Sequence, residues 1–399
     1  MSQKKLMLLG GLRYLLPAIK AAHKQGYYVI TADYLPNNIA HKFSDEYVNV
    51  SIIDKEAVLK VAREKKIDGI MSYAVYPGVV TASYVQKEMG LPAFGPYESV
   101  DILQHKDRFR EFLSKNGFNV PLAKGFDSVE AALQDIYWYP WPVIVKPTDS
   151  AGSKGVTKVE KVEDLRPALE WAMENSLSGH IIVEEFIEKA GCSSDCDCFT
   201  MNGELKVCVF NAQHFDLNAA GPYVPAAYSW PSTFGEDNEA LLKKDIQRLL
   251  SLLKMKTCLY NVETRIGTNG KPYIMECTPR AGGNRLAEMI RYGTGTDVIT
   301  ASVRGCVGDS VEIEQKPFDG HWAEIILHAN KTGVFDSLEI SPDFPGEVIE
   351  RDLWVSHGDH VDSFIGANNA IGTLVLRFET QEALAKSFAN QNWWKVIVK

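Results

Sequence analysis

Apolar and polar positions alternate along the first hundred residues in a repeated strand–helix pattern. The pattern predicts a strand over 5–9, a helix over 15–25, a strand over 27–32, a helix over 55–65 and a strand over 69–73. This order is typical of a parallel sheet with helices on both faces, in which ligands bind beyond the carboxyl ends of the strands. We therefore expect Gly10, Asp33 and Tyr76 at the rim of a pocket.

The pattern changes near Lys106. From there the sequence predicts a helix over 107–115, a helix capped by Ser128 that ends near residue 136, and apolar strands over 143–145 and 181–187. Residues 260–265 alternate as a strand, 268–270 form a turn, and 272–276 return as the partner strand of a hairpin. The second region therefore contains an antiparallel hairpin, unlike the first.

Length, charge and cysteine content limit the class of protein. A chain of 399 residues is too long for one ordinary domain, so we expect two or three. The net charge of -9 argues against a broad nucleic-acid surface and favours a small-molecule partner. No apolar run approaches the roughly 20 residues of a membrane span, and the chain start is too short for a signal peptide, so we expect a cytoplasmic protein without a membrane partner. Seven scattered cysteines suit reduced thiols.

Two lysines and a loop of small residues are candidates for phosphate binding. Lys106 precedes a predicted helix, and Lys146 follows the apolar strand over 143–145. The loop over 148–155 combines glycines and small residues, so consecutive amides can turn inward as an anion-binding nest. A hairpin turn between two strands explains the same loop equally well, and each lysine alone can be explained as a surface residue.

The strand over 181–187 is a candidate for adenine recognition. It is interrupted by Glu184 and Glu185, and its end offers backbone N–H and C=O groups that can read an adenine edge. Phe186 and Ile187 supply an apolar slot. The alternative is an ordinary strand that leaves the sheet with solvated glutamates.

Two other ligand types are disfavoured. Gly10 and Asp33 follow successive strands as in dinucleotide folds, but the spaced glycines of G-x-G-x-x-G are missing, so a supporting sheet without a nucleotide is the better interpretation. Cys192, Cys196 and Cys198 cluster as zinc ligands do, but they form no C-x-x-C pair. Because Cys196 and Cys198 share one face of a predicted strand, packed free thiols are favoured over zinc.

Glu263 and Glu276 are the strongest candidates for metal binding. The predicted hairpin places them on adjacent strands and on one face, where two carboxylates suit Mg²⁺ held jointly with phosphate oxygens. The alternative is a pair of cross-strand glutamates on a solvated face, which repel each other at a modest cost.

Arg280 is a candidate for binding a reacting anion. It follows a proline-fixed bend, and residues 281–285 lie at the start of a predicted helix over 286–292. A guanidinium and helix amides aimed at one place can stabilise the charge of an acyl phosphate and of the tetrahedral species formed from it. Alternatively, Arg280 pairs with an acidic side chain and only holds the turn.

In this order the motifs resemble those of the ATP-grasp superfamily. The segment Arg280-Ala-Gly-Gly with Glu288-Met-Ile-Arg-Tyr-Gly-Thr-Gly-Thr-Asp297 resembles L-amino-acid ligases and related carboxylate–amine ligases. The resemblance implies a mixed α/β and α+β fold in three parts. These are a pre-ATP-grasp, Rossmann-like parallel-sheet domain over 1–105, an ATP-grasp domain over 106–305 and a small β-rich lobe over 306–399. Two α+β subdomains of the second part would clamp ATP, with a lid over about 118–190.

The resemblance also assigns roles to residues. Lys106 and Lys146 would bind phosphates, Arg280 would face the transferred phosphoryl group, and Lys146 and Arg280 would be catalytic. The other implied residues are Ser150, Gly152, Ser153 and Gly155 for the lid, Glu184, Glu185, Phe186, Ile187 and Glu188 for the nucleotide, Glu263, Glu276 and Thr278 for metal, and Gly282, Gly283, Asn284 and Arg285 for substrate.

Two positions depart from the family pattern. Thr278 stands where Glu-x-Asn-x-Arg would have an asparagine, so a hydroxyl replaces an amide that helps to hold metal. The glutamate that usually accepts the ribose has no clear equivalent, which leaves Glu188 and Asp195 as candidates.

The implied function is an ATP-dependent carboxylate–amine ligase that forms an amide or peptide bond through an acyl phosphate and releases ADP and phosphate. The expected cofactors are ATP and Mg²⁺, with two ions and with Mn²⁺ as a substitute, and the expected partners are a small carboxylate and an amine. A homodimer is the expected assembly. Two alternatives stay open: a carboxylase or carbamoyl-phosphate-type enzyme that uses bicarbonate, and a nucleotide-binding protein without catalysis, which Thr278 suggests.

Overall fold

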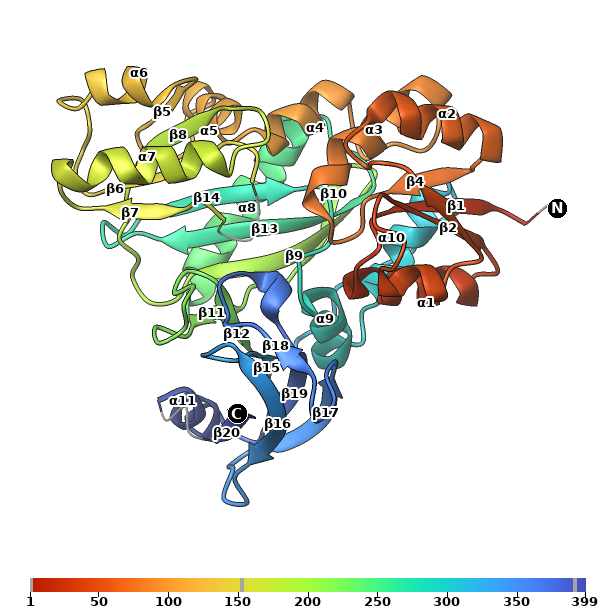
Figure 1. Ribbon diagram of the computed structural model, residues 1–399. Coiled ribbons are helices and arrows are strands. Elements are labelled where there is room, and N and C mark those ends of the chain that lie inside the picture. Colours follow the sequence, from red (N-terminus) through yellow and green to blue (C-terminus); the bar gives the residue numbers. More distant parts are fainter. Residues whose placement is uncertain (1–2, 151–153, 390–392) are drawn as a thin grey trace.

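The computed structural model describes residues 3–150, 154–389 and 393–399 and has three lobes (Figure 1). The N-terminal lobe contains a parallel sheet in the order β3-β2-β1-β4. Its elements are β1 (Lys5–Leu9), α1 (Leu16–Lys24), β2 (Tyr28–Asp33), β3 (Glu46–Asn49), α2 (Lys55–Lys65), β4 (Gly69–Met71) and α3 (Val79–Met89). The predicted parallel sheet is confirmed, although β4 ends earlier than predicted and β3 was not predicted.

The apolar run of β1 reflects its central place in this sheet. β1 pairs with β2 on one side and with β4 on the other, and Leu6, Met7, Leu8 and Leu9 are fully buried. Helices cover both faces of a parallel sheet, so a central strand needs apolar side chains on both faces and does not alternate.

The second lobe begins with an antiparallel sheet in the order β5-β8-β6-β7, here named the outer sheet. It follows α4 (Tyr97–Gln104) and α5 (Lys106–Lys115), and it consists of β5 (Ala123–Phe126), β6 (Val143–Pro147), β7 (Thr157–Val159) and β8 (Ile181–Glu185), with α6 (Val129–Gln134) and α7 (Leu165–Glu174). Ser128 caps α6 as predicted, because its side chain accepts a hydrogen bond from the Ala131 amide at 3.3 Å. These strands and helices share their own apolar core.

A second antiparallel sheet, here named the central sheet, lies below the outer sheet in Figure 1 and has the order β10-β9-β13-β14. Its strands are β9 (Ser194–Met201), β10 (Glu204–Cys208), β13 (Cys258–Ile266) and β14 (Pro272–Thr278), and the long helix α8 (Glu236–Leu252) packs against β10 and β14. The predicted hairpin is confirmed, and its register sets Glu263 opposite Glu276.

The third lobe is built on a sheet in the order β11-β12-β15-β19-β17. Its strands are β11 (Ala212–Phe215), β12 (Pro225–Trp230), β15 (His321–Leu327), β17 (Glu347–Leu353) and β19 (Gly372–Phe378), accompanied by β16 (Gly333–Ile340), β18 (His360–Val361), α11 (Gln381–Ala389) and β20 (Trp394–Val398). β11 and β12 precede the boundary expected at residue 305, so this sheet contains chain from both sides of it. The residue limits of the three parts stay a prediction.

The parallel N-terminal sheet and the antiparallel sheets of the other lobes confirm the predicted mixed α/β and α+β fold. Within the described ranges, no helix is both long enough and apolar enough to cross a membrane.

Gly69 lets the N-terminal sheet and the second lobe approach closely. It begins β4 and lies against α10 (Val298–Cys306), which follows α9 (Leu286–Thr294). A Cβ atom at Gly69 would lie 2.3 Å from the carbonyl oxygen of Cys306. Neither backbone can yield easily, so only glycine fits this contact.

We predict that Gly69→Ala lowers the free energy of unfolding by about 1–3 kcal/mol, because the added methyl group overpacks the junction. Urea unfolding followed by circular dichroism measures the change. Gly366→Ala is the matched control, since the nearest atom to its new Cβ would lie 3.9 Å away. Equal losses in the two variants would contradict a specific contact at Gly69.

Candidate active site

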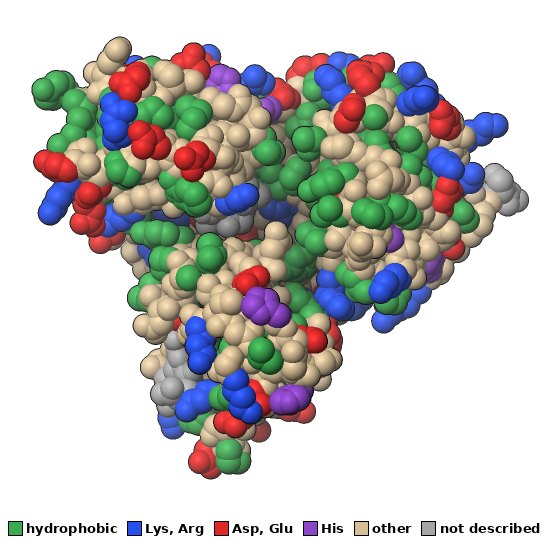
Figure 2. All heavy atoms as spheres, viewed as in Figure 1, with side chains coloured by type: hydrophobic (Ala, Val, Ile, Leu, Met, Phe, Trp, Pro, Cys, Tyr) green, Lys and Arg blue, Asp and Glu red, His purple; other side chains and the backbone are tan. Residues whose placement is uncertain are grey.

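The predicted phosphate-binding residues lie between the outer sheet and the central sheet. Lys106 begins α5, Lys146 lies on β6, and Glu184 lies on the neighbouring strand β8. Figure 2 shows the three lobes around a central hollow in which Lys or Arg side chains are visible. Residues far apart in the sequence therefore meet where the lobes join.

Glu184 is the centre of a buried ion-pair cluster. Its carboxylate pairs with Lys146 and accepts a hydrogen bond from Arg110 Nε at 2.9 Å. Burial alone would raise the pKa of Glu184, but Arg110 and Lys146 outweigh it and lower the pKa to about 2. Glu184 is only 2% exposed, so the solvated glutamate considered as an alternative is wrong here.

Lys106 connects the loop after β6 with β14. Its ammonium donates to the carbonyl oxygen of Ser150 at 2.8 Å and lies 3.7 Å from Glu276 Oε2. Burial lowers the pKa of Lys106, but the charges of Glu276 and Tyr76 raise it by more than burial lowers it. The net shift of the pKa is therefore upward. Lys106 is 9% exposed, which rules out the surface lysine considered as its alternative.

Arg110 is a member of this cluster that the sequence analysis missed. Its Nε contacts Glu184, and its Nη1 donates to the carbonyl oxygen of Met275 on β14 at 2.8 Å. Arg110 Nη2 is buried without a hydrogen-bond partner among the residues described. The available signal was its position four residues after Lys106 on one helix, which places both side chains on the same helix face.

The cluster holds more positive than negative charge. Lys106, Lys146 and Arg110 contribute three positive charges, against two negative charges from Glu184 and Glu276. Burial also lowers the pKa of Lys146, and Glu184 only partly opposes this. A buried surplus of positive charge favours the binding of an anion.

Three carboxylates form a row across the central sheet. Asp195 on β9 faces Glu263 on β13, which faces Glu276 on β14. Burial first, and then Glu263, raise the pKa of Asp195 to about 6. Like charges on neighbouring strands repel, so this row suits a bound cation. The sequence indicated Asp195 only as a candidate for ribose binding, because its place in this row depends on strand pairing.

A second polar row lies two residues along the same strands. Asp197, Asn261 and Thr278 are directly opposite one another on β9, β13 and β14. Asn261 Nδ2 donates to Asp195 Oδ1 at 2.6 Å and lies 3.3 Å from Asp197 Oδ1. Thr278 Oγ1 donates to Glu276 Oε1 at 3.3 Å, so the hydroxyl that departs from the family pattern contacts a candidate metal ligand.

The segment expected to bind adenine is only partly arranged as predicted. β8 ends at Glu185, the Phe186 amide donates to Pro142 O at 3.1 Å, and Ile187 O accepts a hydrogen bond from Arg265 at 3.2 Å. Two expected adenine-reading groups therefore have partners already. Ile187 does lie in a small apolar cluster, and its buried neighbours there are Tyr273 and Met275.

Of the remaining candidates in this segment, Glu185 uses its carboxylate within the protein, whereas Glu188 uses its backbone carbonyl and its side chain is exposed. Glu185 Oε2 accepts a hydrogen bond from the Leu122 amide at 3.2 Å, and Glu188 O accepts one from the Thr268 amide at 2.9 Å. The ribose acceptor therefore stays a prediction.

Arg280 follows β14 and is not held by an acidic partner. Its Nη1 donates to the Ala281 carbonyl oxygen at 2.6 Å, and its Nε is buried without a hydrogen-bond partner in the described part of the chain. No ion pair of Arg280 with a described carboxylate is present within 4.0 Å. The alternative in which Arg280 only pairs with an acid to hold the turn is therefore wrong.

Two amides of the expected substrate loop already donate to carboxylates. The Gly282 amide donates to Asp197 Oδ1 at 2.8 Å, and the Arg285 amide donates to Glu324 Oε1 at 3.1 Å. The prediction that these amides face an anion is wrong for these two, because in this structure they hold the loop against β9 and β15. Gly283 has open space around its Cα, and Asn284 has a left-handed φ of 61°.

The loop between β6 and β7 joins two strands of a hairpin, because Val143 pairs with Val159 in antiparallel register. Gly152 and Ser153, two of its expected lid residues, lie outside the described residues. Gly155 has a φ of +75°, which glycine adopts readily. The anion nest stays a prediction.

The cysteines cluster more tightly than the sequence suggested. Cys196 Sγ lies 3.5 Å from Cys198 Sγ, which lies 3.3 Å from Cys208 Sγ on β10. All three are buried, and burial raises the pKa of Cys196 and Cys198. The shared strand face of Cys196 and Cys198 is confirmed, and the third member, Cys208, was not predicted because it depends on the pairing of β9 with β10. The three sulfur atoms lie within 4.8 Å of one another, so the preference for free thiols over a bound metal ion stays a prediction.

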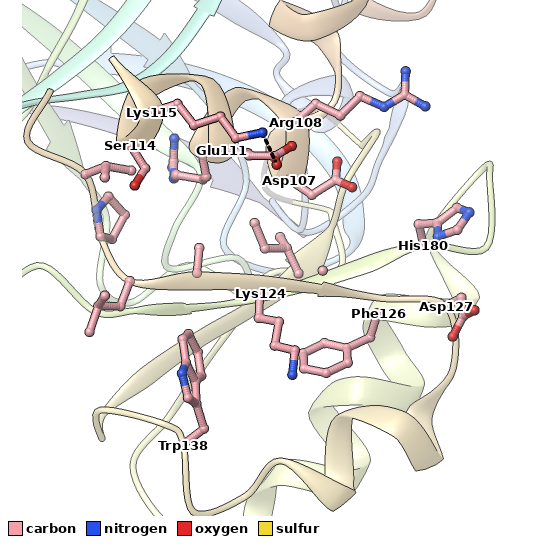
Figure 3. Close-up of a pocket in the computed structure, with 17 residues that line it drawn as sticks. Asp107, Arg108, Glu111, Ser114, Lys115, Lys124, Phe126, Asp127, Trp138 and His180 are labelled. Atoms are coloured by element: carbon pink, nitrogen blue, oxygen red, sulfur yellow. Dashed lines mark hydrogen bonds and ion pairs between the residues drawn. The ribbon is translucent and has the colours of Figure 1, made fainter. Parts of the chain in front are cut away.

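Another hollow, of about 750 Å³, lies between α5 and β5 and is lined in part by Arg110 (Figure 3). Its labelled residues come from α5, such as Glu111 and Lys115, and from β5 and nearby segments, such as Lys124 and Trp138. None of the predicted site residues lines it. Size alone therefore does not identify the functional site.

Comparisons with known proteins agree with this architecture. Residues 139–288 match a family model described as "ATP-grasp domain". The carbamoyl phosphate synthase large chain of Clostridium perfringens (strain 13 / Type A) is 22% identical over 298 residues, which are 74% of this chain and 27% of that protein. The chain therefore spans about a quarter of the length of that curated relative.

Two solved structures match over the full length of both chains. The L-amino acid ligase from Bacillus licheniformis has a TM-score of 0.82 at 18% sequence identity. The phosphoribosylglycinamide synthetase from Anaerococcus prevotii has a TM-score of 0.76 at 20% identity. At these identities the likeness establishes the fold.

We predict that Arg110→Met lowers the free energy of unfolding by about 3–5 kcal/mol, because it removes one partner of a buried ion pair. Arg108→Met is the control, since its exposed pair with Asp101 is worth only about 0–1 kcal/mol. Urea unfolding at neutral pH measures both, and equal effects would contradict the assignment.

The two variants should also differ in how the free energy of unfolding depends on pH, which urea unfolding at several pH values measures. The pKa of Glu184 falls from 4.5 to about 2 on folding, so its contribution to stability is present above pH 4.5 and is lost as the pH falls toward 2. Arg110→Met should lose less stability than the wild-type protein over this window.

Proposed function

Since this chain carries an ATP-grasp domain, we propose that it is an ATP-dependent ligase that joins a carboxylate to an amine. The carboxylate oxygen attacks the γ-phosphorus of ATP, which forms an acyl phosphate and releases ADP. The amine nitrogen then forms a C–N bond, phosphate leaves with the electron pair of the broken C–O bond, and the amine loses a proton. The observation that carries this proposal is the buried positive cluster opposite a row of carboxylates.

The positive cluster would bind the phosphates of ATP. Lys106 pairs with Glu276 of the central sheet, and Lys146 pairs with Glu184 of the outer sheet. An anion bound between the two lysines would balance the remaining positive charge of the cluster. Phosphoryl transfer depends mainly on positioning and on charge stabilisation, and these lysines would reduce the repulsion between an incoming carboxylate and the triphosphate. Ser150 begins the expected lid, and its carbonyl oxygen contacts Lys106, so this contact would hold the start of the lid near the phosphates.

The carboxylate row would hold Mg²⁺. Glu263 and Glu276 offer oxygen ligands from adjacent strands, and Asp195 extends the row. Bound magnesium would neutralise phosphate charge during transfer. Thr278 would orient Glu276 through its hydrogen bond, so the departure from the family pattern is compatible with metal binding.

Arg280 would face the acyl phosphate. Its buried Nε has no hydrogen-bond partner in the described ranges, so it has capacity for another acceptor. Gly283 and Asn284 follow in a loop that is fixed at both ends by Asp197 and Glu324. A fixed loop would keep the reacting groups in line and exclude water from the intermediate.

We predict that Lys146→Met lowers kcat/KM for ATP by roughly 10²–10³-fold, because a preorganised charge is removed. Lys146 is also a partner of buried Glu184, so the variant is assayed at a temperature at which circular dichroism shows that it is folded. Phosphate release is measured with ATP, Mg²⁺ and a panel of amino acids, small carboxylates and bicarbonate, with mass detection of products. The control is Lys115→Met, which removes a surface ammonium paired with Glu111.

Three outcomes of this assay are distinct. A product with the combined mass of a carboxylate and an amine, less water, supports the ligase. Phosphate release stimulated by bicarbonate alone favours a carboxylase, and ATP-dependent thermal stabilisation without turnover of any member of the panel favours a nucleotide-binding protein without catalysis.

We predict that Glu276→Gln raises the Mg²⁺ concentration for half-maximal ATP turnover by roughly 10–100-fold, because a charged ligand becomes neutral. Glu204→Gln, on an exposed position of the same sheet, should leave it unchanged. If Glu276→Gln has the same magnesium dependence as the wild-type protein, Glu276 is not a ligand of the metal.

A further inference from the structure

Arg265 connects the row of carboxylates with residues 184–188, which are expected to bind adenine and are here named the adenine segment. It lies on β13, two residues after Glu263 and on the same face of the central sheet. Its Nη1 donates to the carbonyl oxygen of Ile187 at 3.2 Å, and its Nη2 pairs with Glu263 Oε1 at 3.0 Å. One guanidinium therefore occupies an acceptor in each half of the proposed site.

The contact with Ile187 can be exchanged for a ligand. Phe186 and Glu188, on either side of Ile187, make hydrogen bonds from backbone to backbone. The partner of the Ile187 carbonyl oxygen is a side chain instead, and a side chain can turn away while the backbone stays in place. The exocyclic amino group of adenine is a hydrogen-bond donor, so it would compete with Arg265 for this oxygen.

The contact with Glu263 opposes the binding of a metal ion. The side chain of Glu263 is 33% exposed, so an ion can reach its carboxylate. An ion bound there would lie beside the guanidinium, and the two positive charges would repel each other. Arg265 and the metal ion therefore compete for Glu263.

The two contacts of Arg265 depend on each other. Its side chain is 18% exposed, and an ion pair that is partly open to solvent contributes little stability by itself. Its Nε is buried and has no hydrogen-bond partner among the described residues, so this nitrogen adds no third contact there. Each contact holds the guanidinium in position for the other. A ligand that displaces one of them therefore weakens the other.

We propose that Arg265 is a positioning residue that keeps Glu263 paired until adenine occupies the adenine segment, so that the nucleoside and the metal ion bind with positive coupling. The first ligand displaces the guanidinium, and the second ligand does not have to displace it again. The inference rests on the proposed function and describes how the same site is regulated. The carboxylate row would take up its ion together with the nucleotide and not before it.

Adenosine and Mn²⁺ test this coupling, because adenosine has no phosphate with which to carry the ion. Electron paramagnetic resonance measures free Mn²⁺ during a titration of the whole protein, with and without saturating adenosine. Adenosine should raise the affinity for Mn²⁺ roughly 5–150-fold. Coupling between two sites is reciprocal, so Mn²⁺ should raise the affinity for adenosine by the same factor, which equilibrium dialysis measures.

Arg265→Met distinguishes a competing guanidinium from a structural one. Without the competing cation, the variant alone should bind Mn²⁺ as tightly as the wild-type protein does with adenosine, and adenosine should have no further effect. A structural role predicts the opposite, since a loosened adenine segment would weaken the binding of both ligands. Arg377→Met, at an exposed position of β19, is the matched control and should keep the wild-type coupling.

Three results would overturn the inference. These are binding of both ligands to the wild-type protein without coupling, coupling that persists in Arg265→Met, and weaker binding of Mn²⁺ by Arg265→Met that is folded by circular dichroism. If Arg265→Met does not fold, Arg265→Gln takes its place with the same expectations.

The proposed function fails in a different way. A wild-type protein that binds neither adenosine nor Mn²⁺, and that ATP with Mg²⁺ does not stabilise against heat, contradicts the nucleotide site, and the inference about Arg265 falls with it. Stabilisation by ATP with Mg²⁺ but no coupling between adenosine and Mn²⁺ overturns only the role of Arg265.

Discussion

The structure depends on one buried electrostatic knot, in which Glu184 pairs with Lys146 and Arg110. These side chains come from β8, β6 and α5, and Arg110 reaches further to the backbone of β14. This ion-pair cluster connects the outer sheet to the central sheet through polar contacts, and it places a surplus of positive charge where the two sheets meet. Buried charges of this kind are stable only when every partner is present. The same residues that would bind phosphate therefore also fix how the two sheets approach.

Strand register then organises the opposite side of the site. The pairing of β9, β13 and β14 produces two polar rows, one of three carboxylates and one of Asp197, Asn261 and Thr278. Asn261 bridges Asp195 and Asp197, so a single amide orders both rows. Thr278 is one member of the second row, and most of the polar groups in the two rows come from its neighbours and not from its own side chain.

The sequence predicted those features that depend on local pattern. The parallel N-terminal sheet, the capped helix α6 and the hairpin that pairs Glu263 with Glu276 all follow from periodicity and turn residues within short windows. Asp195 and Cys208 were missed or misplaced because their roles arise from the pairing of strands that are distant in the sequence. Arg110 and Glu324 were missed because their partners lie in distant segments of the chain. Arg110 was the nearest to discovery, since helical spacing alone puts it beside Lys106. The free amides expected at 282–285 were misjudged because two distant carboxylates, invisible from that segment, already occupy them.

The sheet of the third lobe begins with β11 and β12, which the chain forms before it completes the central sheet. β12 pairs with β15, so the last part of the chain is woven into the middle part. Removal of the last part would leave β12 as a bare edge with unpaired N–H and C=O groups, a surface that invites pairing between molecules and aggregation. The third lobe therefore cannot be removed without exposing a strand of the middle part, whereas the outer sheet shares no strand with its neighbours and is joined to the central sheet through side chains.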